Sequence, residues 1–117
     1  MANKDYVFPD KQQKRKKLKP KERRRVLEQL GNKCSYCGKL CKQNDIHLDH
    51  VIPISRGGGA DRDNLAAACC MCNITKYDLF IEDFFDKVLS RRNEIKKEMR
   101  YYNKVIRHMK QKYGFDE

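Results

Sequence analysis

The sequence has no apolar stretch that approaches the ~18 residues of a membrane-spanning helix, so we expect no membrane insertion. Its first residues, MANKDYVFPDKQQKRKK, also lack the apolar core of a secretory signal. We therefore expect an intracellular, cytoplasmic protein. In such a reducing compartment the six cysteines are better explained as metal ligands or free thiols than as disulfides.

Internal repeats and long apolar runs are both absent, and 117 residues leave room for one domain with a small core. Apolar residues make up 39% of the chain and charged residues 37%, and the mean hydropathy is −0.93. A domain of this size often needs a metal or disulfides to stabilise it.

Acidic residues are scarce at both ends of the chain. Residues 1–25 contain eleven Lys and Arg against three acids, and residues 87–112 contain ten against two, so each segment carries a net charge of +8. The centre, residues 26–86, carries −3 and the last five residues carry −2, so the whole chain carries +11. Two cationic flanks favour a polyanionic partner, most commonly nucleic acid, although such flanks can also be merely solvated.

Periodicity and turn residues predict the following elements. Residues 1–20 contain Pro9 and Pro20 and many Lys and Gln, which is typical of a loosely attached arm. A helix follows from Lys21 to a C-cap at Gly31. We expect a strand over residues 45–54, ended by Pro53, a loop over 55–64, and a short helix from Asn73.

The C-terminal part, roughly residues 81–113, predicts a long amphipathic helix, with room for one break. Its apolar positions recur at spacings of three, four and seven: Val88, Ile95, Met99, Tyr102, Ile106, Met109 and Tyr113. Packing of this stripe on the domain core is our preferred interpretation. A dimer seam is the alternative, and Arg92 interrupts the pattern that it would need.

The cysteines form two Cys-x2-Cys pairs, Cys34 with Cys37 and Cys69 with Cys72. Two such knuckles complete a tetrahedral thiolate site, the usual arrangement for structural zinc. Their separation exceeds that of a simple zinc ribbon, so a sizeable segment is inserted between them. Cys41 and Cys70 remain, and we interpret both as free thiols, with exchange of one for a ligand as the alternative. A redox-active dithiol is the alternative role for a Cys-x2-Cys pair, but the sequence lacks the βαβ pattern that accompanies it in thioredoxin-like folds.

The inserted segment and second knuckle, HLDHVIPISRGGGADRDNLAAACCMCN from His47 to Asn73, resemble the HNH nuclease family. The matching elements are an Asp-His pair, an apolar run with proline, Ser-Arg-Gly-Gly, Asn-Leu, and Cys-x2-Cys-Asn. With Cys34 and Cys37 the resemblance covers about residues 30–80. It implies an α+β fold, a small ββα-metal (His-Me finger) core stabilised by structural zinc, with flanking N- and C-terminal helices.

The resemblance also implies roles for individual residues. His50 is the general base that activates water, and Asp49 and Asn73 supply oxygen ligands to a catalytic divalent cation. Asn64 holds the loop that orients His50. A neutral imidazole can accept a proton near neutral pH, and hard oxygen ligands favour Mg²⁺ or Mn²⁺. The family often has histidine at the third position, and asparagine there leaves both Mg²⁺ and Mn²⁺ as candidates.

Three further residues are candidate nucleic-acid contacts: Arg56 and Lys76 to phosphate, and His47 to phosphate or water. We expect three parts: a basic N-terminal arm over 1–20, a nuclease core with zinc knuckles over 21–80, and the amphipathic basic helix over 81–117. A monomer and a homodimer through that helix both stay open.

The resemblance implies metal-dependent hydrolysis of duplex DNA, by nicking or by double-strand cleavage, that leaves 5′-phosphate and 3′-hydroxyl ends. The sequence contains no recognisable sequence-reading module such as a helix-turn-helix, so we expect weak sequence preference unless a protein partner supplies it. Phage, mobile-element and restriction nucleases are the family contexts that fit. The alternatives are a zinc-stabilised nucleic-acid-binding module without turnover, and an interaction protein that pairs through its C-terminal helix.

Overall fold

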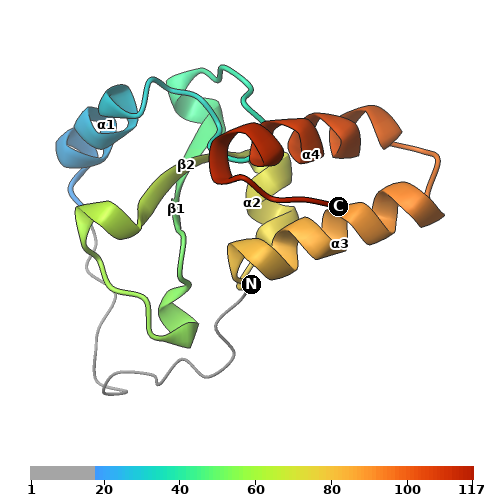
Figure 1. Cartoon of the computed structure of the whole chain (residues 1–117). Coiled ribbons are helices and arrows are strands. Elements are labelled where there is room, and N and C mark those ends of the chain that lie inside the picture. The colour runs from blue at the N-terminus through green and yellow to red at the C-terminus, as the bar shows by residue number, and fades with distance from the viewer. Residues whose placement is uncertain (1–17) are drawn as a thin grey trace.

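The structure is a computed structural model that describes residues 18–117. The first seventeen residues of the expected basic arm lie outside the described residues. The described chain forms α1 (Pro20–Gln29), β1 (Ile46–His50), β2 (Leu65–Cys69), α2 (Cys70–Lys76), α3 (Ile81–Glu94) and α4 (Met99–Tyr113). Figure 1 shows the strands and α2 at the centre, α1 on one side, and the pair α3 and α4 on the other. The expected α+β fold with a ββα core is therefore confirmed.

The two strands pair antiparallel in a single hairpin, with Ile46 opposite Cys69 at one end and His50 opposite Leu65 at the other. β1 ends earlier than the sequence predicts. The amide of Val51 donates to the carbonyl of Asn64 (2.9 Å), and the chain then enters a short 3₁₀ turn over Ile54–Arg56. The connection between the strands thus leaves the sheet directly after His50.

Helix α2 begins at Cys70, three residues before the predicted start at Asn73. Cys69 acts as the N-cap, because its sulfur accepts a hydrogen bond from the amide of Cys72 (3.4 Å). The second knuckle therefore forms the first turn of the helix, and Asn73 lies within the helix rather than at its start.

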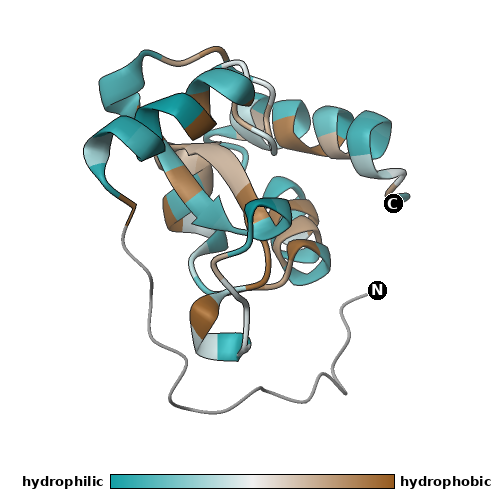
Figure 2. Ribbon diagram, turned by 90° about the vertical axis from the view of Figure 1, so that its left-hand side faces the viewer, coloured by the Kyte–Doolittle hydropathy of each residue, from teal (hydrophilic) through white to brown (hydrophobic). Residues whose placement is uncertain are grey.

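The C-terminal part is a helical hairpin and not one long helix. α3 and α4 are separated by residues 95–98, where Glu98 has a positive φ of 69°. Most of the apolar stripe packs inward: Val88, Tyr102, Ile106 and Met109 are buried in the core, whereas Ile95 and Met99, at the connection between the helices, are each 41% exposed. Figure 2 shows hydrophilic outer faces on these helices and more apolar strands between the layers. The stripe is thus used within the chain, as the packing interpretation predicts.

A second, smaller core lies on the side of α1, where Leu27 packs with Ile46 and Ala67. The sheet is therefore covered on both sides, by α1 and by the α3–α4 hairpin. Among residues 18–117, no helix combines the length and the apolar character needed to cross a membrane.

Candidate active site and metal centre

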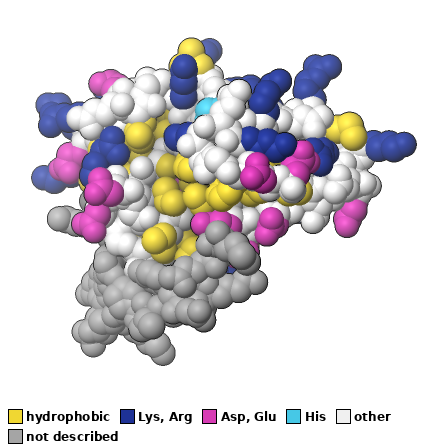
Figure 3. Space-filling view, in the orientation of Figure 1, with side chains coloured by type: hydrophobic (Ala, Val, Ile, Leu, Met, Phe, Trp, Pro, Cys, Tyr) yellow, Lys and Arg dark blue, Asp and Glu magenta, His cyan; other side chains and the backbone are white. Residues whose placement is uncertain are grey.

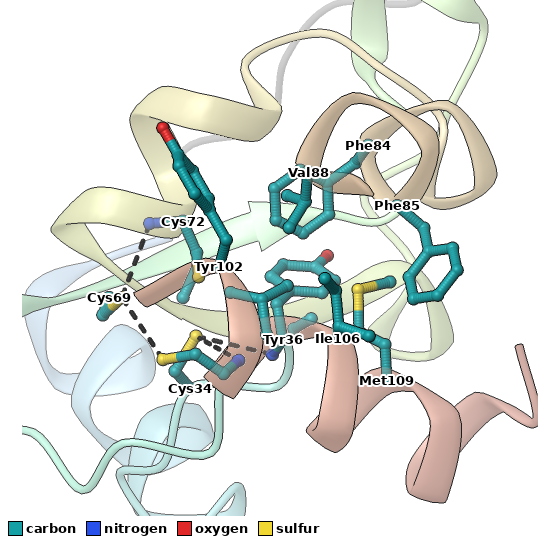
Figure 4. Packing of buried hydrophobic residues seen from close by; sticks show 14 residues of the cluster. Cys34, Tyr36, Cys69, Cys72, Phe84, Phe85, Val88, Tyr102, Ile106 and Met109 are labelled. Carbon is teal, nitrogen blue, oxygen red and sulfur yellow. Dashed lines mark hydrogen bonds between the residues drawn. The ribbon is translucent and has the colours of Figure 1, made fainter. Parts of the chain in front are cut away.

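The four cysteines of the two knuckles converge in the structure. All four are buried, and their sulfur atoms lie within 4.8 Å of one another: Cys34, Cys37, Cys69 and Cys72. Figure 4 shows this cluster beside the aromatic core, with Cys69 and Cys72 arriving from the β2–α2 junction. The predicted four-cysteine metal site is therefore present as a geometric cluster.

The first knuckle is shaped by backbone hydrogen bonds to sulfur. The amides of Tyr36 and Cys37 both point at the sulfur of Cys34 (3.4 and 3.5 Å), and Gly38 closes the turn with a φ of 77°. The amide of Ser35 donates to the carbonyl of Ala67 in the middle of β2 (2.7 Å). This bond fixes the knuckle against the strand that leads to the second knuckle.

The spacing of the sulfurs fits a tetrahedral ion. A zinc–sulfur distance of about 2.3 Å implies sulfur–sulfur edges near ~3.8 Å, and Cys37 and Cys69 are 3.7 Å apart. Hydrogen bonds from Cys37, Cys69 and Cys72 hold the pKa of the Cys34 thiol well below its ordinary value, whereas hydrogen bonds within the same cluster raise the pKa of the Cys37 and Cys72 thiols. Without a cation the negative charge is therefore concentrated on Cys34, and a bound metal would be needed to deprotonate those two thiols. Cys70 is exposed and Cys41 half-buried, and neither belongs to the cluster.

Tyr101 of α4 completes this end of the molecule. Its hydroxyl donates to the sulfur of Cys72 (3.1 Å), and burial raises its pKa far above the usual value for tyrosine. A hydrogen bond to the sulfur of a metal-binding cysteine orients that sulfur and changes its affinity for metal. The C-terminal hairpin is thus coupled to the cysteine cluster, which the sequence did not reveal.

Asp49 and His50 occupy the opposite end of the hairpin, at the last two positions of β1. Asp49 is buried, and His50 is half-buried. The Oδ2 atom of Asp49 accepts a hydrogen bond from the hydroxyl of Tyr36 (2.6 Å) and lies 3.0 Å from the Nζ of Lys76. The carboxylate is therefore fixed from two directions, by the first knuckle and by α2.

Lys76 differs from its sequence-based interpretation as a phosphate contact. Its side chain has no exposed surface, and its ammonium group also donates to the carbonyl of His50 (3.1 Å). A buried lysine of this kind needs a counter-charge, and Asp49 provides it. In this structure Lys76 acts on the candidate site through Asp49 and the backbone of His50, and not by facing solvent.

Asn64 makes the contacts expected of a residue that holds the loop. Its Oδ1 accepts from the amide of Ile52 (2.8 Å), and its Nδ2 donates to the carbonyls of Ile52 (3.0 Å) and Gly59 (2.8 Å). The backbone there is tightly packed, because a Cβ on Gly58 would lie 1.7 Å from the carbonyl oxygen of Ile52. Only glycine fits at position 58, and the loop after His50 is thereby fixed in place.

Asn73 is half-buried in α2, three residues before Lys76. Residues three apart lie on the same side of a helix, so Asn73 is on the side from which Lys76 reaches Asp49. The structure thus brings α2, β1 and the Asn64 loop to one region.

His47 and Arg56 lie elsewhere. His47 pairs with Ala68 toward the cysteine end of the hairpin and lines a pocket of about 990 Å³. Arg56 is partly exposed, but its Nε donates to the carbonyl of Asp78 (2.6 Å) and its guanidinium lies 5.4 Å from the centre of the Phe80 ring. Arg56 therefore links the glycine loop to the turn after α2.

Tyr36 is the residue that the sequence analysis missed. It is fully buried, and burial together with the charge of Asp49 raises its pKa well above the usual value. The hydroxyl is consequently a hydrogen-bond donor to the carboxylate at neutral pH. Its position between Cys34 and Cys37 was a usable signal, because residues of that knuckle lie close to the cysteine cluster and to the hairpin.

Comparison with known proteins agrees with this arrangement. Residues 34–79 match the family model of the HNH endonuclease. YoqL, an SPbeta prophage-derived protein of Bacillus subtilis (strain 168) that is named for the HNH endonucleases, is 32% identical over 68 residues. That alignment covers 49% of this chain but only 28% of YoqL. The Type II-C Cas9 enzyme from Actinomyces naeslundii is similar over 74% of this chain and 10% of its own, with 24% identity and a TM-score of 0.43.

Proposed function

We propose, from the similarity of residues 34–79 to the HNH endonuclease family, that the chain is a divalent-metal-dependent endonuclease that hydrolyses DNA phosphodiester bonds. The observation that carries the proposal is the arrangement around the hairpin end. β1 ends in Asp49-His50, β2 runs directly into the helix that bears Asn73, and Lys76 of that helix reaches Asp49. The aligned segment is only 28% of YoqL, so activity and substrate are proposals for this chain.

His50 is the proposed general base. Hydrolysis requires a water molecule to lose a proton as it attacks phosphorus, and an imidazole with a pKa near ~6.5 can accept that proton at neutral pH. The backbone of His50 is held by Lys76, and the chain that follows is held by Asn64. Both contacts restrict where the imidazole can lie, which is what a positioned base needs.

Asp49 and Asn73 are the proposed oxygen ligands of the catalytic cation, and their oxygen chemistry fits Mg²⁺ or Mn²⁺. Such an ion, when bound, neutralises charge that develops on the phosphate and the leaving oxygen. Both donors to Asp49 meet Oδ2, so Oδ1 is the atom that we propose for the ion. Tyr36 and Lys76 would set the direction of that oxygen.

The four cysteines are proposed to bind zinc as a structural ion behind the site. Their buried thiols and the spacing near that of a tetrahedron support this choice. Zinc would fix the knuckle that carries Tyr36 and the helix that carries Lys76, so the metal site would maintain both contacts of Asp49.

The distribution of charge supports a polyanionic substrate. Lys and Arg side chains are numerous along the upper edge of the face in Figure 3, over α1 and α4, while Asp and Glu are interspersed on the left side and across the middle. Such flanking charge suits phosphate contacts, which carry no sequence information. We propose weak sequence preference, and a cleavage map concentrated at one motif would contradict it.

The test is nicking of supercoiled plasmid by zinc-loaded protein with Mg²⁺ or Mn²⁺, beside His50→Ala and a reaction quenched with EDTA. We expect metal-dependent nicking that falls by about 10²–10⁴-fold in His50→Ala. His50→Ala must retain the circular dichroism spectrum of the wild type, so that the loss reports chemistry. Equal activity of the two proteins would overturn the role of His50.

One observation favours a second candidate, a zinc-stabilised DNA-binding module without turnover. The ammonium group of Lys76 already neutralises Asp49, and a divalent cation would have to bind beside that positive charge. DNA binding without cleavage under any divalent ion would select this alternative. Biological context remains a further proposal, with an intracellular phage, mobile-element or restriction nuclease as the family setting that fits best.

A further inference from the structure

Tyr77, directly after α2, has a backbone conformation that tyrosine rarely adopts. Its φ is 48° and its ψ is −112°, and the amide of Leu79 closes the turn by donating to the carbonyl of Lys76 (2.9 Å). These angles correspond to the first central position of a type II′ turn, which glycine dominates. A Cβ at this position is strained, so local structure gives no reason for a tyrosine here.

Burial gives no reason either. The side chain of Tyr77 is 77% exposed, the highest fraction among the large apolar and aromatic residues that the structure shows as exposed. Ile74, one helical turn earlier on α2, is 65% exposed. The chain therefore has a strained backbone and an exposed ring at Tyr77, and a second exposed apolar side chain three residues earlier. Strained residues that the fold does not need are concentrated at functional sites.

The turn that carries Tyr77 is held firmly next to the candidate active site. Lys76, its neighbour in sequence, contacts both Asp49 and the carbonyl of His50. On the other side, Arg56 donates to the carbonyl of Asp78 and lies over the ring of Phe80. Tyr77 thus belongs to a turn whose two neighbouring residues contact the end of β1 and Arg56 of the glycine loop.

We infer that Tyr77 is a stacking site for an unpaired nucleobase of the substrate, near the phosphate that His50 would address. This inference rests on the proposed nuclease function. An aromatic ring offers a flat apolar face, and every base has a complementary face. In an intact duplex those faces are covered by the neighbouring base pairs. The site therefore selects DNA with unpaired nucleotides next to the scissile phosphate.

The first experiment separates binding from cleavage and from stability. In a His50→Ala background without divalent ions, fluorescence anisotropy measures binding of a labelled single strand and of an intact duplex of equal length. We expect Tyr77→Gly to weaken single-strand binding about tenfold and duplex binding far less. Because glycine relieves the backbone strain, the unfolding midpoint of Tyr77→Gly stays equal to or above that of the parent.

Matched variants sharpen the result. Tyr77→Phe keeps the ring and is expected to bind as the parent does. Leu40→Ala removes a comparably exposed apolar side chain, 67% exposed, from the first-knuckle turn at the cysteine end, and it should leave both affinities unchanged. An unchanged single-strand affinity in Tyr77→Gly, or equal losses for the two DNA forms, would overturn the inference. A protein partner or a duplex groove would then be the occupant.

A direct reading of stacking is available because the chain contains no tryptophan. Tyr77→Trp would introduce a single indole whose emission is quenched when a base stacks on it. We expect quenching by the single strand and not by the intact duplex, and none in Leu40→Trp. Bound single strand with unchanged emission would count against the site, whereas plasmid nicking that depends on His50 would still support the nuclease proposal.

Discussion

The two ends of the β1–β2 hairpin carry side chains of opposite chemical character. At one end, where Ile46 pairs with Cys69, four soft sulfur donors are buried within 4.8 Å of one another. At the other end, where His50 pairs with Leu65, Asp49 and His50 offer oxygen and nitrogen. Buried sulfurs suit an ion that stabilises a fold, and hard donors beside a half-buried imidazole suit chemistry on a phosphate.

The end with Asp49 and His50 depends on the end with the four cysteines. Tyr36 belongs to the first knuckle, yet its hydroxyl binds the carboxylate of Asp49. Lys76 lies four residues after Cys72 on α2 and reaches the same carboxylate. The cysteine end therefore positions the groups that hold Asp49. Loss of the cysteine site should disrupt the proposed catalytic end, where Asp49 and His50 lie, whereas damage there should leave the cysteine site intact.

Removal of zinc is the largest expected perturbation. Structural zinc contributes on the order of 10 kcal/mol in small domains, comparable with the whole stability of a domain of this size. Strong chelation should therefore unfold the domain and not merely inactivate it. Circular dichroism with a parallel zinc assay checks this, and an unchanged spectrum after verified zinc loss would refute the structural role.

Lys76→Met should follow in size, because it leaves the buried carboxylate of Asp49 without its counter-charge. We expect a loss of about 3–5 kcal/mol in the free energy of unfolding, measured by urea denaturation. Lys87→Met is the matched control, since Lys87 is half-buried and donates to the carbonyl of Thr75 without meeting a carboxylate. Added Asp49→Asn should restore part of the loss, and equal losses in Lys76→Met and Lys87→Met would argue against the ion pair.

Asn64→Ala tests the loop at the catalytic end. It removes three hydrogen bonds to the backbone of Ile52 and Gly59, and buried partners left unsatisfied cost about 1–3 kcal/mol. We expect slower plasmid nicking with zinc content unchanged. Asn44→Ala, at an exposed position near the cysteine end, should affect neither. Full activity of Asn64→Ala would remove its proposed positioning role.

Two tyrosine-to-phenylalanine variants give the smallest and most selective effects. Tyr101→Phe removes the hydrogen bond to Cys72 and should lower zinc affinity about tenfold, measured by competition with a chelator. Tyr36→Phe removes the hydrogen bond to Asp49 and should slow nicking about tenfold, because one charge-assisted hydrogen bond is lost. Zinc affinity should stay unchanged in this variant. If each variant affected both properties equally, the division between the two ends would not hold.

Much of this arrangement followed from local patterns. The two Cys-x2-Cys pairs predicted the cysteine cluster, because the spacing of ligands in a knuckle acts over a short distance. The ββα core was implied by the resemblance of the segment from His47 to Asn73 to HNH nucleases. Asn64 and its loop followed from the same motif. The HNH resemblance is confirmed by the family model over residues 34–79.

What the sequence did not predict depends on contacts between distant residues. In the sequence Lys76 looks like an exposed lysine that could contact phosphate. Its burial is explained only by the side chains of Asp49 and Tyr36, which lie next to it in the structure. The sequence allowed one break in the C-terminal helix but did not predict its position between α3 and α4, because the apolar spacing of four from Ile95 to Met99 continues across it. The early start of α2 depends on capping by the Cys69 sulfur, which propensity alone does not indicate.

One series on wild type, Cys72→Ser and His50→Ala tests whether the cysteine site maintains the fold while His50 serves only the reaction. Bound zinc, far-ultraviolet circular dichroism and Mg²⁺-dependent plasmid nicking are measured on the same preparations. We predict that Cys72→Ser loses zinc, structure and nicking together, while His50→Ala keeps zinc and structure and loses nicking alone. A folded Cys72→Ser protein that nicks DNA, or a His50→Ala protein that nicks as well as wild type, would contradict the account.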